Sequence, residues 1–126
     1  VLALLPNAYM QGHTAGVNMA GGNEVFGKAI PMNSIGFFGL HIMTAGTYEG
    51  EMYEEKSDST LKRLFTKDGL LKGFILIGKT ERAGIYTSLI RERTPLDTID
   101  FETMKKVATS VAFSPENRRK KFGGVV

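Results

Sequence analysis

With 126 residues, of which 42% are hydrophobic and 23% charged, the chain is long enough for one hydrophobic core and has the composition of an ordinary globular protein. It has no cysteine, which excludes disulfides, thiolate metal sites and cysteine nucleophiles, and its two histidines lie too far apart to predict a zinc site. The formal net charge of +3 is too small to indicate nucleic-acid binding. Because no apolar stretch reaches membrane length and residues 1–5 lack the basic flank of a signal peptide, we expect a cytoplasmic protein.

The stretch LLPNAYMQGHTAGVNMAGG, residues 4–22, predicts a helix that begins at Pro6. Leu5 precedes a proline and therefore favours an extended backbone, whereas Pro6 suits the first helical position because its missing N–H has no partner there. One helix face carries mostly small residues, namely Ala8, Gly12, Ala15, Gly16 and Met19. Glycine inside a helix costs about 1 kcal/mol relative to alanine, so this face predicts close approach by a backbone or a flat ligand.

The middle of the chain predicts strands. After a loop, residues 34–47 predict one long strand with apolar residues on both faces, as in a strand that is covered on both sides. Residues 49–56 predict an exposed strand. Residues 60–65 and 70–78 predict an antiparallel hairpin, because the intervening Asp-Gly pair supplies the turn chemistry.

Three helices are predicted after the strands. Thr80 is the expected cap of a helix that ends near Arg93, with a buried stripe formed by Ile85, Tyr86, Leu89 and Ile90. Asp100 is the expected cap of the next helix, whose apolar face comprises Phe101, Met104, Val107, Ala108 and Val111. Ser114 opens a short helix that ends near Gly123. The sequence therefore predicts an α+β fold, in which helices pack on an antiparallel sheet and one further helix precedes it.

One literal motif, GFILIGKT at residues 73–80, fits the pattern of a phosphate-binding loop. In such a loop the four central residues form a tight backbone cradle after a strand, whereas Phe-Ile-Leu-Ile is apolar and typical of a strand itself. No later apolar strand ends in a magnesium-binding aspartate. We therefore interpret the motif as a hairpin strand followed by a helix cap.

The remaining polar residues predict no catalytic and no metal site in this chain. His13 is expected to be solvated or at the edge of the core, and His41 to be partly buried with its polar atoms satisfied. Glu54 and Glu55 are neighbours in a strand, so their side chains point to opposite faces and cannot act on one bond. The basic run from Arg118 to Lys121 complements a helix end and faces solvent, or alternatively docks an acidic protein.

The opening stretch resembles a segment of FAD-dependent pyridine nucleotide-disulfide oxidoreductases, in which the pattern L-x-P-x-A-x-x-Q-G-x-x-A-G-x-N-x-x-G follows the second flavin motif. The matching residues are Leu4, Pro6, Ala8, Gln11, Gly12, Ala15, Gly16, Asn18 and Gly21. Residues 30–46 look like the strand with which the chain enters the C-terminal interface domain in the NADH oxidase and NADH:rubredoxin reductase branch. Residues 70–96 are similar to the hairpin strand of that domain, the helix that follows it and the turn after the helix. The resemblance covers roughly the first hundred residues.

This resemblance implies that the start of the first helix faces the pyrimidine end of the flavin. There Leu5, Pro6, Asn7, Ala8 and Tyr9 would form the cofactor-binding turn, with the N–H groups of Asn7, Ala8 and Tyr9 stabilising negative charge on the reduced flavin. Residues 1–22 would be the terminal helix of an FAD-binding domain, and residues 23–126 a C-terminal α+β interface domain. FAD and NAD(P)H belong to the parent enzyme in this interpretation.

The chain contains no G-x-G-x-x-G motif, so neither dinucleotide site is expected here and this chain alone should bind no cofactor and catalyse no reaction. It starts at Val1 rather than at a methionine, so we expect it to be cut from a longer polypeptide. The implied partners are the upstream FAD and NAD domains, a second copy in a homodimer, and an acidic electron-carrier protein. The alternative hypothesis is a stand-alone, non-enzymatic dimerisation or protein-binding module.

Overall fold

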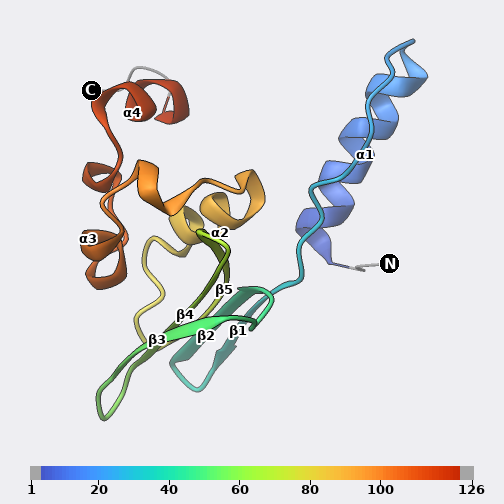
Figure 1. The fold of residues 1–126 in the computed structure, drawn as a ribbon. Helices are drawn as coiled ribbons and strands as arrows, with labels where there is room; N and C mark the ends of the chain where they lie inside the picture. Colours follow the sequence, from blue (N-terminus) through green and yellow to red (C-terminus); the bar gives the residue numbers. More distant parts are fainter. Residues whose placement is uncertain (1–3, 123–126) are drawn as a thin grey trace.

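The computed structural model describes residues 4–122, except for the side chains of residues 118 and 120–122. These residues form a helix, five strands and three further helices (Figure 1). The strands are β1 (Met32–Phe37), β2 (Leu40–Gly46), β3 (Glu51–Lys56), β4 (Leu61–Lys67) and β5 (Leu70–Ile77). The helices are α1 (Leu5–Met19), α2 (Ala83–Glu92), α3 (Phe101–Lys106) and α4 (Pro115–Phe122), and Leu96–Thr98 and Ser110–Ala112 form short 3-10 turns.

The five strands form one antiparallel sheet in the order β1-β2-β5-β4-β3, and helices pack on it, which confirms the predicted α+β fold. The predicted hairpin is β4 and β5, and its turn has positive φ angles at Asp68 (55°) and Gly69 (68°). Aspartate and glycine tolerate this left-handed conformation, which matches the twist of the paired strands. The exposed strand predicted at residues 49–56 is β3.

The prediction of one long strand at residues 34–47 is wrong, because the segment folds back on itself as the hairpin of β1 and β2. Its two-residue turn has positive φ angles at Phe38 (46°) and Gly39 (83°). Coverage on both sides is also wrong, since Ile35 is 55% exposed and Phe37 is 64% exposed. The apolar residues on both sides of this segment therefore do not indicate a doubly covered strand.

The core lies between the sheet and α2. Phe74 and Leu76 of β5 and Leu64 of β4 point toward the helix, where Tyr86 and Leu89 meet them. The rings of Phe74 and Tyr86 have centroids 5.7 Å apart. Tyr86 and Leu89 are at most 1% exposed, which confirms the predicted buried stripe of α2. Ile85 and Ile90 pack against this cluster as partly buried residues.

The predicted cap of α2 is wrong. The helix begins at Ala83, and Arg82 occupies the cap position with a left-handed backbone (φ 61°) and no side-chain capping bond. The Thr80 carbonyl accepts a hydrogen bond from the Ala83 N–H at 3.3 Å, so a turn precedes the helix. Gly78, whose φ is 79°, redirects the chain after β5 and delays the start of the helix.

The predicted cap of α3 is confirmed. The Asp100 carboxylate accepts hydrogen bonds from the Thr103 hydroxyl at 2.6 Å and from the Thr103 N–H at 3.0 Å. These bonds hold the pKa of Asp100 below its usual value, because they favour the charged carboxylate. The helix, however, ends at Lys106, and the predicted core residues Val107 and Val111 are 57% and 69% exposed. The extended backbone of Val107 ends the helical face before those residues reach the core.

The last helix begins as predicted, because the Ser114 hydroxyl accepts the Asn117 N–H at 3.3 Å. Its expected end near Gly123 lies outside the described residues.

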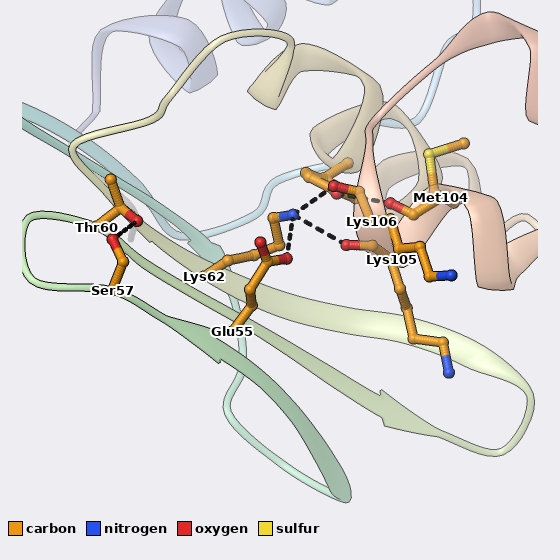
Figure 2. A network of polar contacts seen from close by, with 8 residues as sticks. Glu55, Ser57, Thr60, Lys62, Met104, Lys105 and Lys106 are labelled. Atoms are coloured by element: carbon orange, nitrogen blue, oxygen red, sulfur yellow. Dashed lines mark hydrogen bonds and ion pairs between the residues drawn. The ribbon is translucent and has the colours of Figure 1, made fainter.

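The end of α3 is fixed by two donors that are distant in sequence (Figure 2). The Lys62 ammonium donates to the carbonyls of Lys105 (3.0 Å) and Lys106 (2.7 Å), and also to the Glu55 carboxylate at 3.0 Å. The Tyr86 hydroxyl donates to the Met104 carbonyl at 2.7 Å. Terminal carbonyls of a helix have no partner within the helix, so these bonds join α3 to the sheet and to α2.

Candidate functional site

The first turn of α1 starts one residue earlier than predicted. Leu4 is extended (φ −121°, ψ 139°), Leu5 is the first helical residue, and Pro6 follows it. The Ala8 N–H donates to the Leu4 carbonyl at 2.9 Å, so it is not available to a ligand as predicted. The same helical geometry pairs the Tyr9 N–H with the Leu5 carbonyl and leaves the N–H groups of Leu5 and Asn7 without an acceptor inside the helix.

This first turn presents its side chains to solvent. Leu5 is 85% exposed and Tyr9 78% exposed, and Pro6 and Ala8 are exposed as well. The turn has no acidic residue, and no side chain among the described residues caps it. The positive end of the helix dipole therefore remains available to a negatively charged group.

Asn7 is the exception, because it is fully buried. Its amide Nδ2 donates to the Ile30 carbonyl at 3.0 Å, which ties the start of α1 to the segment that enters β1. Within the described residues its Oδ1 has no hydrogen-bond partner. A buried acceptor without a partner costs about 1–3 kcal/mol. The sequence assigned Asn7 only a backbone role and gave no signal for this anchoring side chain.

The small-residue face of α1 is uncovered. In Figure 1, α1 projects from the rest of the molecule, and the segment that follows it runs back alongside the helix. The Asn18 side chain fastens this segment through two hydrogen bonds to the Glu24 backbone (2.9 and 2.7 Å). A Cβ added at Gly12 or Gly16 would meet nothing within 4 Å. The close approach predicted for this face therefore has no partner among the described residues.

A second uncovered surface lies on the sheet. Residues of β1, β2 and β5 that alternate with the core residues form an apolar patch, which we term the open sheet face: Ile35, Phe37, Leu40, Ile42, Ile75 and Ile77. In the register, Ile35 lies opposite Ile42, and Ile42 lies opposite Ile77. All six side chains are exposed or half-buried. An apolar patch of this kind is typical of an interaction surface.

The histidines and the paired glutamates lie apart from one another in the part of the chain that the structure describes. His13 is exposed, as predicted, whereas His41 is exposed on the turn side of β2 and not partly buried. Glu54 pairs with Arg63 (2.6 Å) and Glu55 with Lys62 (3.0 Å), as expected for side chains on opposite faces. Within residues 4–122, no three His, Asp or Glu side chains come together as a metal site. The His41 prediction failed because the turn places this residue near the end of a hairpin.

The motif at residues 73–80 is not a phosphate loop. Its four apolar residues lie in β5, and Gly73 packs against the backbone of Thr47 and Ala45, as a sheet residue does.

The basic run falls in α4, where Arg119 is exposed. The side chains of Arg118, Lys120 and Lys121 lie outside the described part of the chain. Among the described residues, no helix combines the length and the apolar character needed to cross a bilayer.

The chain is similar to one subunit of a known oxidoreductase. It is 36% identical over 103 residues to the NADH-dependent phenylglyoxylate dehydrogenase subunit epsilon of Aromatoleum evansii. This alignment covers 75% of the present chain and 24% of that subunit, so the chain spans about a quarter of the length of this relative. No family model matches the chain.

Proposed function

We propose that this chain is the C-terminal portion of an FAD-dependent NAD(P)H oxidoreductase, which passes electrons from a nicotinamide cofactor through flavin to an acceptor. Residues 1–22 would complete the FAD-binding domain, and residues 23–126 would form the interface domain. The similarity to an NADH-dependent dehydrogenase subunit supports this proposal, as does the fraction of that subunit that the chain spans. The upstream FAD and NAD domains would be its first partners, and the chain alone would not be catalytic.

The observation that carries the proposal is the pair of uncovered features on α1. Its first turn offers free N–H donors and an uncompensated dipole, and its small-residue face has room for a closely packed neighbour. A helix gains most of its stability in proteins from the packing of one face. Both features are what an FAD-binding domain would require of its terminal helix.

The residues of the first turn fit a flavin. Bound FAD would accept a hydride from the nicotinamide and pass electrons onward. The N–H groups of Leu5 and Asn7 and the helix dipole would stabilise the negative charge that reduction adds, while the exposed side chains of Leu5 and Tyr9 provide apolar contact area. Relative to the sequence prediction, the donor set changes from Asn7, Ala8 and Tyr9 to Leu5 and Asn7.

A charge placed at Ala8 tests this orientation. In the full-length flavoprotein, Ala8→Glu is expected to lower the midpoint potential of the flavin by roughly 30 mV relative to Ala8→Gln, because a carboxylate opposes added negative charge. Glutamine has nearly the same size without the charge and is the matched control. The measurement is a redox titration followed by flavin absorbance. Equal potentials for the two variants would contradict a flavin-facing first turn.

Gly12 tests whether a neighbour covers the small-residue face. In the present 126-residue chain, Gly12→Ala should stabilise the helix by about 0.5–1 kcal/mol, since alanine favours the helical backbone and the added methyl meets no atom. In the full-length parent the same change should destabilise the protein, because a packed neighbour would have to move.

Thermal unfolding measures whether Gly12→Ala stabilises or destabilises each of the two proteins. Stabilisation in the full-length protein as well would show that nothing packs against Gly12 there.

We further propose that the open sheet face joins two copies in a homodimer, and that an acidic electron carrier docks at the basic run of α4. The stand-alone binding module remains the alternative function, favoured by the apolar open sheet face. An immunoblot of source-cell lysate separates the two functions. A single band at 13.8 kDa would support the module, and a band several times larger would support the flavoprotein.

A further inference from the structure

A hollow of about 270 Å³ lies where the ends of β3 and β4, the link between β5 and α2, and the end of α3 meet. Six charged residues line it, and we term it the basic hollow: Lys62, Lys79, Arg82, Lys106, Glu55 and Glu81. Four cations and two carboxylates leave a net charge of +2. This charge is concentrated in one concave site, although the chain as a whole has a net charge of only +3.

Two of the six charges neutralise one another at the wall of the hollow. Lys62 and Glu55 are paired at 3.0 Å, and the hydrogen bond from Lys62 lowers the pKa of Glu55 (Figure 2). Lys62 also donates to the two terminal carbonyls of α3, so all three of its N–H donors are in use. Lys62 and Glu55 are therefore held in place by one another and by α3, and the cations available to a ligand are Lys79, Arg82 and Lys106.

The other three cations have unused donors. In the described part of the chain, the ammonium groups of Lys79 and Lys106 donate no hydrogen bond and form no ion pair within 4 Å, although Lys79 lies close enough to Glu55 to lower its pKa. Arg82 donates one hydrogen bond, to the Ala108 carbonyl at 3.4 Å, and has four further N–H groups. Glu81 opposes these three charges at the hollow, and Glu55, although paired with Lys62, also attracts Lys79 electrostatically. Gathered like charges repel, and a bound anion would relieve that repulsion.

We propose that the basic hollow binds a small phosphate-class anion, held by the side chains of Lys79, Arg82 and Lys106. Arginine and lysine form charge-assisted hydrogen bonds to phosphate oxygens, and arginine offers two at once. The volume suits one phosphate or pyrophosphate group, whereas pockets for whole organic ligands commonly reach several hundred Å³ or more. The hollow is open to solvent, and its three cationic side chains are exposed, so an ion can enter it directly.

Lys79 follows the glycine of the rejected GFILIGKT motif, and the proposed site differs from a phosphate loop in its mechanism. In a phosphate loop, backbone N–H groups cradle the anion. Here three side chains from two separate segments surround it, and the four central residues of the motif remain in β5. The proposed site is independent of the flavin-facing role of α1.

Titration of the 126-residue chain with sodium pyrophosphate at constant ionic strength tests the proposal. We expect saturable binding by calorimetry, with NMR signal shifts concentrated at residues 78–83 and 106–108. The double variant Lys79→Ala/Arg82→Ala should weaken binding by about tenfold or more, because it removes most of the charge-assisted donors. Lys56→Ala is the matched control, since Lys56 is exposed and adjacent to Glu55 but lies on the other side of β3. This control should bind pyrophosphate as the parent chain does.

Three outcomes would overturn the proposal. The first is the absence of saturable binding of pyrophosphate. The second is that Lys56→Ala weakens binding as much as the double variant does, which would show that only the general surface charge matters. The third is binding of a hexaglutamate peptide without binding of pyrophosphate, which would make the hollow part of a docking surface for an acidic protein. Circular dichroism of the exposed-residue variants verifies that they are folded.

Discussion

Phe74→Ala is expected to lower the free energy of unfolding by about 3–5 kcal/mol, as is usual for a buried phenylalanine. Phe74 is 1% exposed, lies in the central strand β5 and faces the ring of Tyr86. Truncation would remove this contact and leave a cavity between the sheet and α2, because neighbouring strands hold the backbone in place. Urea unfolding followed by circular dichroism measures the change.

Ile35→Ala is the matched control for this core truncation. Ile35 is also an apolar strand residue, but it is 55% exposed on the open sheet face, so its loss should cost less than about 1 kcal/mol in the isolated chain. Similar losses for the two variants would mean that the two faces of the sheet are buried to a similar degree.

Local sequence patterns predicted the elements in which neighbouring residues decide the structure. The Asp68-Gly69 turn and the apolar stripe of α2 were both readable, because each depends on a few nearby residues. The hairpin of β1 and β2 was not readable, since its turn is Phe38-Gly39 and lacks the usual Asn-Gly or Asp-Gly signal. The alternation of apolar residues continues through that turn and suggested one strand.

Contacts between distant residues were beyond the reach of sequence patterns. Lys62 caps the end of α3 from more than forty positions away, and Tyr86 does so from α2. Burial raises the pKa of Tyr86 to about 12, so its hydroxyl can donate to the Met104 carbonyl at a higher pH than an exposed tyrosine could. From the sequence, Tyr86 was predicted only as a member of an apolar stripe, because periodicity indicates burial and not the hydrogen-bond partner.

The candidate site shows how a one-residue difference changes the chemistry. The sequence identified the first turn of α1, but the helix begins at Leu5 and not at Pro6. As a consequence, Ala8 donates within the helix, and the free donors are those of Leu5 and Asn7. Proline is acceptable at either of the first two positions of a helix, so Pro6 alone could not show whether the helix begins at residue 5 or at residue 6.

The proposed homodimer gives the last prediction. Ile35→Lys should raise its dissociation constant by at least about 100-fold, because a lysine placed within an apolar interface would be buried without a partner. The monomer should keep its stability, since this side chain is more than half exposed in the single chain, at 55%. Analytical ultracentrifugation over a range of protein concentrations measures the equilibrium.

Val111→Lys is the matched control, because Val111 is 69% exposed but lies after α3 and not on the sheet. It makes the same chemical change on a surface that the proposed interface does not include, so its dissociation constant should equal that of the parent chain. If both lysine variants weaken the dimer equally, the interface is not the open sheet face. If neither weakens it, or if the parent chain is a monomer at high concentration, the apolar residues of β1, β2 and β5 must be explained by a different partner, of which the upstream domains of the proposed flavoprotein are the first to test.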